Sequence, residues 1–170
     1  MARTELERTV QPSLLEWLTD RDPRTPADPP VTREESVRRY RLSVLRDVEW
    51  LLNTRRTAVA VPAALGELRA SVFDYGLPDT LGVSLETPDG REQLARWLEE
   101  TLATFEPRLL DVRVALAELD AASAPQVHFT LSAWLRMDPS PLQVVFDTVL
   151  DLASGGYAIG EAGAAGAGAP

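Results

Sequence analysis

The chain has 170 residues, 45% of them hydrophobic and 25% charged, and its 26 acidic against 17 basic side chains give a formal net charge of −9. This composition is typical of a soluble globular domain, and the acidity argues against general binding to nucleic acid, which requires clustered positive charge. The absence of cysteine excludes disulfides and cysteine–zinc sites. Because neither a secretory signal nor an apolar run long enough for a membrane span is visible, we expect a cytoplasmic protein without direct membrane insertion.

Residues 1–31 are predicted to form an N-terminal arm. A short apolar piece, Ser13–Leu18, precedes a proline-rich segment at 22–30, which forbids a regular helix. We expect the apolar side chains of the short piece to anchor the arm, on the domain or on a partner, because leaving them in water is unfavourable. These side chains are Leu14, Leu15, Trp17 and Leu18.

About three helices are predicted in the next part of the chain. Thr32 and Glu35 form a capping-box pattern at the start of the first, which carries a buried stripe at helical spacing. A short helix is expected from Pro62, and another from about Asp89 to Phe105, where Asp89 and Glu92 give a capping signal and Pro107 stops the helix. The stripe of the first helix consists of Val37, Tyr40, Val44, Val48 and Leu51.

The hydrophobic period then changes from 3.6 to 2, which indicates about three half-buried strands. Apolar residues alternate with polar or small ones at 110–117, 126–132 and 142–148, and turns are expected at 120–125 and 138–141. Helices followed by strands predict an α+β fold, with the helices on one face of a small antiparallel sheet. We place a single domain at 32–159 and a disordered Gly/Ala tail at 160–170.

The block Asp47–Arg56 joins an apolar helical face to two adjacent guanidinium groups. Arginine grips carboxylates with two parallel hydrogen bonds, so Arg55 and Arg56 behind Trp50 and Asn53 indicate a docking point. A plainer interpretation, that the two arginines stabilise the C-terminal end of a helix dipole, stays open.

A catalytic site is not indicated. Glu49, Asp74 and Glu106 lie beside aromatic or apolar residues and could form an acid–base pair, but 26 acidic residues make such adjacency ordinary. The single histidine, His128, is predicted to be a surface residue, and no metal site, cofactor site or phosphate-binding glycine motif is expected.

Several motifs, in chain order, resemble TssE, a baseplate subunit of the type VI secretion system related to the wedge protein of contractile phage tails. They cover roughly residues 13–159. The motifs are Ser13-Leu-Leu, Glu49-Trp-Leu-Leu-Asn-Thr-Arg-Arg56, Ser71-Val-Phe-Asp-Tyr-Gly-Leu-Pro-Asp79, Phe105-Glu-Pro-Arg-Leu109, Phe146-Asp-Thr with Asp151, and Ser154-Gly155.

The resemblance implies a structural, non-enzymatic component of a type VI secretion baseplate, assembled at the inner face of the cytoplasmic membrane. Its implied partners are the wedge subunits TssF and TssG, with TssK as a further candidate, and the sheath proteins TssB and TssC. The triplet Glu106, Pro107 and Arg108 resembles the family's contact with the wedge core bundle. The family's lysozyme-like label leaves a peptidoglycan-cleaving hydrolase as the alternative.

Two physical devices fit a joining role. Glu106 and Arg108 flank a proline at a helix-to-strand junction, so they are predicted to project as preorganised anchors or, alternatively, to pair with each other inside the domain. The third strand carries one charge between Leu142 and Leu150 and no internal proline, so Val144, Val145 and Phe146 are a candidate edge for strand addition. The alternative is that this strand is central.

Overall fold

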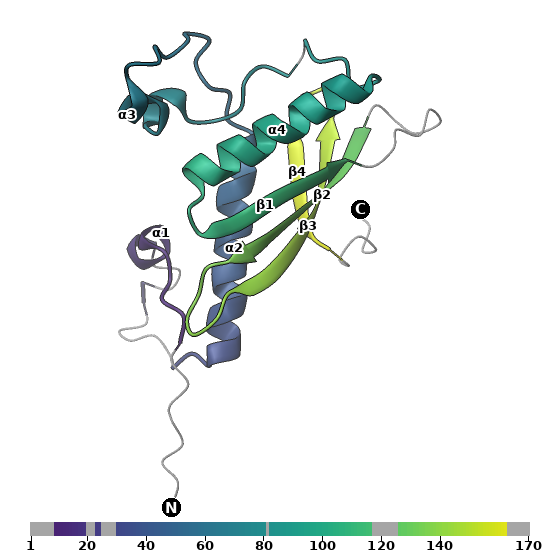
Figure 1. Cartoon of the computed structure of the whole chain (residues 1–170). Coiled ribbons are helices and arrows are strands. Elements are labelled where there is room, and N and C mark those ends of the chain that lie inside the picture. The colour runs from purple at the N-terminus through teal and green to yellow at the C-terminus, as the bar shows by residue number, and fades with distance from the viewer. Residues whose placement is uncertain (1–8, 20–22, 25–29, 81, 117–125, 163–170) are drawn as a thin grey trace, which may run out of the picture.

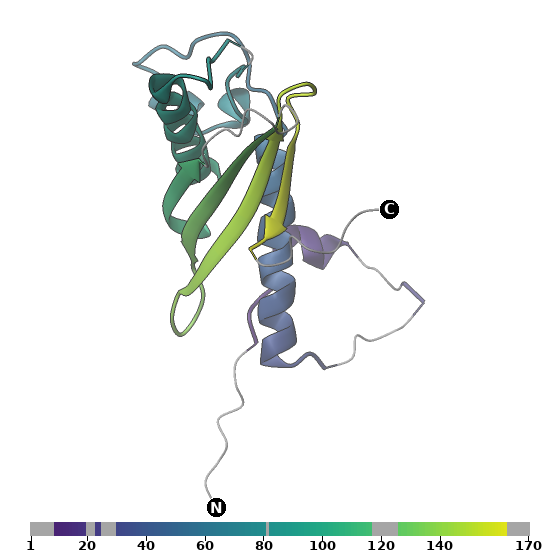
Figure 2. The ribbon, with the colours of Figure 1, turned by 90° about the vertical axis from the view of Figure 1, so that its right-hand side faces the viewer.

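Two long helices lie on one face of an antiparallel sheet (Figures 1 and 2). The computed structural model describes residues 9–19, 23–24, 30–80, 82–116 and 126–162. Within these residues the helices are α1 Leu14–Leu18, α2 Arg33–Leu52, α3 Gly66–Arg69, the 3-10 helix η1 Val72–Asp74, and α4 Pro88–Phe105. The strands are β1 Leu109–Leu116, β2 Gln126–Leu135, β3 Leu142–Asp151 and β4 Tyr157–Glu161.

The α+β class is confirmed, but the described part of the sheet has four strands in the order β1-β2-β3-β4, where about three were predicted. The additional strand, β4, contains Gly160 and Glu161, which the sequence assigned to the tail. Glycine weakens a strand signal, so its pattern resembled the low-complexity sequence that follows. The predicted turn at 120–125 lies outside the described residues.

Alternating burial in β2 and β3 confirms the predicted period of 2. In β1 the alternation is broken, because Asp111 has a φ of 50° and the pairing with β2 shifts register between Leu110 and Arg113. This β-bulge turns Leu109 and Val112 inward, where the sequence predicted Leu110 and Val112. The sheet packs its buried face on α2 and α4, whose core residues include Val44, Val48, Leu94, Leu98 and Leu102.

The helix starts differ from the predicted ones in instructive ways. Thr32 does cap α2 through the Glu35 amide at 3.2 Å, but the Glu35 carboxylate binds Arg38 and Arg39 instead of completing a capping box. The cap of α4 is Thr87, two residues before the predicted Asp89, with Pro88 in the first turn. The helix predicted from Pro62 is reduced to α3, because few partners bury its apolar side chains and Leu65 is half exposed.

The Glu35 carboxylate should titrate abnormally. Hydrogen bonds from Arg38 and then Arg39 lower its pKa from 4.5 to about 2. A folded-state pKa below the unfolded value stabilises the protein above pH 4.5, and this contribution is lost as the pH falls through about 2. We expect a carboxyl titration by NMR to give about 2 in the native chain and a value nearer 4.5 in the double variant Arg38→Ala, Arg39→Ala. Titration of the native Glu35 near 4.5 would contradict this.

No helix among the described residues is long and apolar enough to cross a membrane.

Candidate functional site

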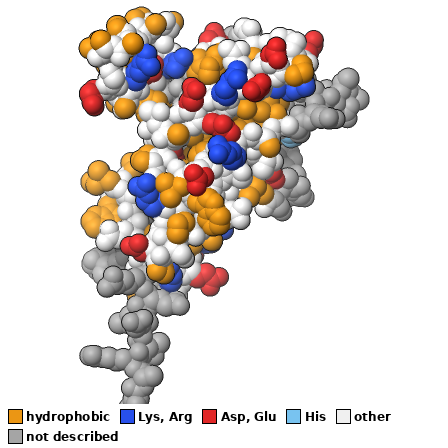
Figure 3. Space-filling model, in the orientation of Figure 1, with side chains coloured by type: hydrophobic (Ala, Val, Ile, Leu, Met, Phe, Trp, Pro, Cys, Tyr) orange, Lys and Arg blue, Asp and Glu red, His pale blue; other side chains and the backbone are white. Residues whose placement is uncertain are grey.

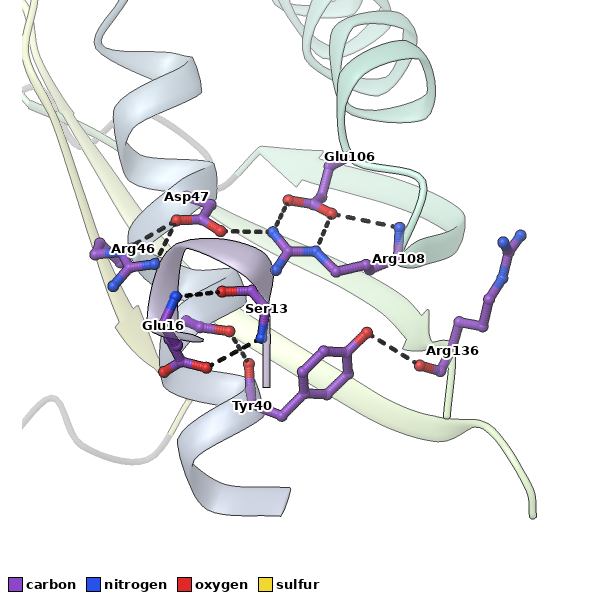
Figure 4. Close-up of polar contacts among 9 residues, drawn as sticks. Ser13, Glu16, Tyr40, Arg46, Asp47, Glu106, Arg108 and Arg136 are labelled. Atoms are coloured by element: carbon purple, nitrogen blue, oxygen red, sulfur yellow. Dashed lines mark hydrogen bonds and ion pairs between the residues drawn. The ribbon is translucent and has the colours of Figure 1, made fainter. Parts of the chain in front are cut away.

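The middle of α2 carries a charged cluster that ties it to the turn between α4 and β1 (Figure 4). We call it the Arg108 cluster; its members are Arg46, Asp47, Glu106 and Arg108. Arg108 donates from Nε to Glu106 at 2.6 Å, from its terminal nitrogen to the other Glu106 oxygen, and to Asp47 at 2.7 Å. Asp47 also accepts from Arg46 at 2.9 Å, and the Arg46 guanidinium lies 5.1 Å from the ring centre of Trp50.

Burial makes this cluster structural. The Glu106 side chain is 6% exposed, against 22% for Arg108 and 23% for Asp47. Burial by itself would lower the pKa of the Arg108 guanidinium, but its hydrogen bonds to Glu106 and Asp47 outweigh burial and raise that pKa. Arg108 therefore stays charged and compensates two carboxylates, one of which is almost fully removed from water.

The prediction that Glu106 and Arg108 project as anchors is thus wrong for Glu106, and the alternative of an internal pair holds. A buried carboxylate without a partner is strongly unfavourable, so the pair forms within the domain. The residue between them, Pro107, is exposed, and so is Trp50 at 54%. The surface that the triplet offers to a partner is therefore Pro107 and the outer part of Arg108.

The C-terminal end of α2 brings together three of the motifs singled out in the sequence. The Leu77 amide donates to the Thr54 carbonyl at 2.8 Å, and the Arg56 amide donates to the Leu77 carbonyl at 2.9 Å. Asn53 binds both backbone groups of Tyr157, at 2.8 and 2.9 Å, as a neighbouring strand would. We call this meeting of 53–56, 76–78 and 154–157 the motif junction.

Arg56 and Asp74 lie 4.0 Å apart at the edge of this junction. They also line an open cleft of about 790 Å³ between the segment 56–79 and α4, to which Trp97 and Phe105 contribute. The Glu49 side chain is half-buried, and its carbonyl accepts from the Asn53 amide group. The residues predicted for docking therefore divide between the Arg108 cluster and the motif junction.

The candidate edge at Val144, Val145 and Phe146 is wrong, because β3 pairs with β2 on one side and with β4 on the other. Val144 and Phe146 are core residues at 1% and 0% exposure. The Val145 carbonyl accepts from the Ala162 amide at 3.1 Å. The order of strands in the sheet depends on which strands pair, and the alternation of apolar and polar residues within one strand does not reveal its neighbours.

The structure also shows where the residues considered for catalysis or metal binding lie. His128 is exposed on β2, as predicted. Both Glu106 oxygens are bound by Arg108, and Asp74 faces Arg56. In the described parts of the chain, no group of three or more His, Cys, Asp or Glu side chains is arranged to hold a metal ion.

Sequence reasoning missed two partners of these clusters, Asp47 and Tyr157. Asp47 contacts Arg108 across 61 positions of the chain, and Tyr157 contacts Asn53 across 104. The one usable signal was glycine: Gly76 and Gly155, with φ of 109° and 71°, stand at the turns that build the motif junction.

The protein is a small domain in which long helices pack on a four-stranded antiparallel meander. Many of its motif residues connect segments of the domain to one another. The family model for baseplate wedge protein gp25 matches residues 38–140, from α2 to the turn after β2. Because this covers more than half of the chain, the protein belongs to the gp25 baseplate wedge family.

A search of solved structures gives a similar chain from the baseplate complex of the type VI secretion system. The two are 24% identical, with a TM-score of 0.43, over 64% of this chain and 91% of that one. A search of curated proteins gives no match.

Proposed function

We propose that the protein is a non-enzymatic structural component of a type VI secretion baseplate. In this role it joins the wedge subunits TssF and TssG, with TssK as a further neighbour, to the first ring of the TssB–TssC sheath, and it acts as a template for sheath assembly. It would do so in the cytoplasm, at the inner face of the cytoplasmic membrane. Membership of the wedge family supports the proposal, together with the TssE-like motifs in chain order.

The observation that carries the templating step is the difference between the two sheet edges. On β1, α4 covers the edge: the Glu99 carboxylate accepts the outward amide of Val114 at 2.9 Å, and a bulge bends the strand nearby. Natural sheets block strand addition by such devices.

On β4, no described residue is hydrogen-bonded to the outward backbone groups of the second half of the strand. The Ala162 amide donates to the Val145 carbonyl, and the Asp151 amide donates to the Gly156 carbonyl. Because hydrogen-bonded pairs alternate along an antiparallel ladder, the backbone amides and carbonyls of Ala158 and Gly160 point toward β3. The amides and carbonyls of Tyr157, Ile159 and Glu161 therefore point away from the sheet. Asn53 occupies those of Tyr157, which leaves Ile159 and Glu161 for an incoming strand.

The Ile159 amide provides a test of templating. Ile159→Pro removes an outward donor without removing a hydrogen bond to β3, so we expect sheath assembly from purified TssB and TssC to fail while binding to TssF–TssG persists. Ile159→Val, which keeps the amide, is the matched control. By contrast, Val145→Pro would break the β3–β4 ladder itself, because the backbone of Val145 pairs with β4. Sheath assembly by Ile159→Pro at the native rate, with the fold intact by circular dichroism, would refute templating at β4.

The wedge contact is expected at the exposed face around Trp50 and Pro107. Apolar side chains also gather on α1 and before α3 (Figure 3), and the four of α1 are 41–75% exposed. Truncating a buried interface tryptophan typically costs about 2 kcal/mol or more, so Trp50→Ala should weaken binding to TssF–TssG by well over tenfold in calorimetry. Trp134→Ala, with a similarly exposed ring at 43% on β2, is the control. Equal affinities of the two variants would place the contact elsewhere.

A peptidoglycan hydrolase is less well supported, since Arg108 binds both oxygens of Glu106 and leaves neither free to give a proton to a substrate. Turnover of purified peptidoglycan would reverse this ranking.

A further inference from the structure

A small pocket opens beside the C-terminal end of α2 in the motif junction. Its volume is about 160 Å³. One wall is apolar and comes from Leu52, Leu77 and Pro78, and the rest is polar and comes from Asn53, Arg55, Thr80, Ser154, Gly155, Gly156 and Tyr157. We call it the Arg55 pocket. It is separate from the Arg108 cluster and from Ile159 and Glu161, the β4 residues proposed to accept an incoming strand.

The guanidinium of Arg55 makes no hydrogen bond or ion pair with any described residue. This is notable in a chain with nine more acidic than basic side chains. Arg55 is not needed to cap α2 either. Asn53 binds the Glu49 carbonyl through its side chain at 2.9 Å, and the Thr54 hydroxyl binds the Trp50 carbonyl at 2.7 Å. The dipole interpretation left open by the sequence therefore has little support.

The backbone of Arg55 is held in place. Arg55 forms a parallel bridge with Leu77, between the two hydrogen bonds that join 54–56 to Leu77. On the other side, a Cβ on Gly155 would stand 3.4 Å from a terminal nitrogen of Arg55. The guanidinium therefore lies directly against the backbone of Gly155, and the fixed backbone of Arg55 reduces the entropy lost when Arg55 binds a ligand.

Tyr157 also lines the pocket, and it is 6% exposed. Its hydroxyl is buried beside the Thr80 side chain but forms no hydrogen bond of normal geometry with any described residue. Burial raises the pKa of this hydroxyl to about 12, against a smaller lowering by Thr80, so it is a neutral donor at physiological pH. A buried hydroxyl in this state is unfavourable until something accepts its proton in a hydrogen bond.

We propose that the Arg55 pocket receives the carboxylate of an Asp or Glu side chain from a neighbouring protein subunit. Arg55 would bind the two carboxylate oxygens as a planar fork, the Tyr157 hydroxyl would donate to one of them, and the apolar wall would cover the methylene groups. A carboxylate fits better than a phosphate, because one guanidinium compensates a single negative charge and the surrounding chain is acidic. The proposal deepens the proposed function and rests on it for the identity of the partner as a baseplate or sheath subunit.

The isolated protein offers a direct test that needs no partner. The blocked peptide acetyl-Gly-Glu-Gly-amide is added to the ¹⁵N-labelled chain, and the Nε–Hε signal of Arg55 and the amides of Gly155 and Gly156 are followed by NMR. We expect saturable shifts at these signals and none with acetyl-Gly-Gln-Gly-amide. The Nε–Hε signal of Arg136, another exposed arginine without a side-chain partner among the described residues, is the internal control and should not move.

Two variants separate binding from folding. Arg55→Ala should abolish the shifts of Gly155 and Gly156 while leaving the urea midpoint unchanged. Tyr157→Phe should leave the midpoint unchanged or raised, because it removes an unsatisfied hydroxyl, yet weaken peptide binding about tenfold, which is typical for a lost hydrogen bond to a charged group.

The remaining outcomes decide against the proposal. Equal shifts with the Gln peptide, shifts at Arg136 as large as at Arg55, or tighter binding of inorganic phosphate than of the Glu peptide would each overturn it. The proposed function is tested separately by Ile159→Pro and Trp50→Ala. If those variants fail in assembly and the Glu peptide does not bind, the carboxylate pocket is wrong and the baseplate role stands.

Discussion

Arg108→Ala is expected to lower the free energy of unfolding by roughly 3 kcal/mol, the usual consequence of removing one partner from a buried ion pair. The loss of stability arises from the two carboxylates that Arg108 binds in the native protein. Glu106 is 4% exposed and would lose its compensating cation, and Asp47 would retain Arg46 alone. An equilibrium urea titration of both proteins measures the difference.

A matched control and a double variant identify the cause. Arg96→Ala breaks an exposed pair with Glu92, whose side chains are 58% and 69% exposed, and should change stability by less than about 0.5 kcal/mol. Arg108→Ala combined with Glu106→Gln should be more stable than Arg108→Ala alone, because the amide removes the stranded charge. If the double variant is as unstable as the single one, the effect comes from lost packing of the arginine stem and not from the charge.

The Arg108 cluster also illustrates what the sequence could predict. The helix-to-strand junction at Glu106–Arg108 and the helical face of α2 were both found from local patterns. That the triplet faces Asp47 on α2 was not, because the two elements lie about sixty positions apart and no period relates them. The sequence left external anchors and an internal pair as alternatives, and burial decided between them.

The sheet gives the same lesson in another form. Each strand with clear alternation was found, since a half-buried strand reveals its own inward face. The position of β3 inside the sheet depends on β4, whose glycine at 160 made it look like part of the tail. The candidate edge was therefore assigned to the wrong strand, and strand addition at β4 is the proposal in its place.

The motif junction was the least predictable feature, because its three segments come from distant parts of the chain. Each contributes a motif that the sequence had marked: Asn53–Arg56, the turn at Gly76, and Ser154–Gly155. Most of their polar contacts are made with one another inside the domain, as Asn53 makes with Tyr157. Much of what looked like a partner-binding signature is thus used to build the surface, and Arg55 is the member whose guanidinium has no partner among the described residues.

Gly76→Ala should have a comparably large effect on stability, because two independent constraints meet at this residue. Its φ of 109° is unfavourable for any residue with a Cβ, which costs roughly 1–3 kcal/mol. The new Cβ would also lie 2.3 Å from the Thr54 carbonyl oxygen, so 54–56 and 76–78 would have to separate. That separation removes the two backbone hydrogen bonds of Leu77, each worth about 1 kcal/mol.

A total loss of about 3–5 kcal/mol is therefore expected in urea titration for Gly76→Ala. Gly66→Ala is the matched control: its Cβ would meet nothing within 4 Å, and alanine is the better helix former, so this variant should be as stable as the native chain or slightly more. Because Leu77 fixes the backbone of Arg55, Gly76→Ala should also lose the response of the Arg55 signal to the Glu peptide in whatever fraction stays folded. A folded Gly76→Ala protein that binds the peptide as the native chain does would show that Arg55 is oriented without the junction, and the structural basis given for the pocket would be wrong.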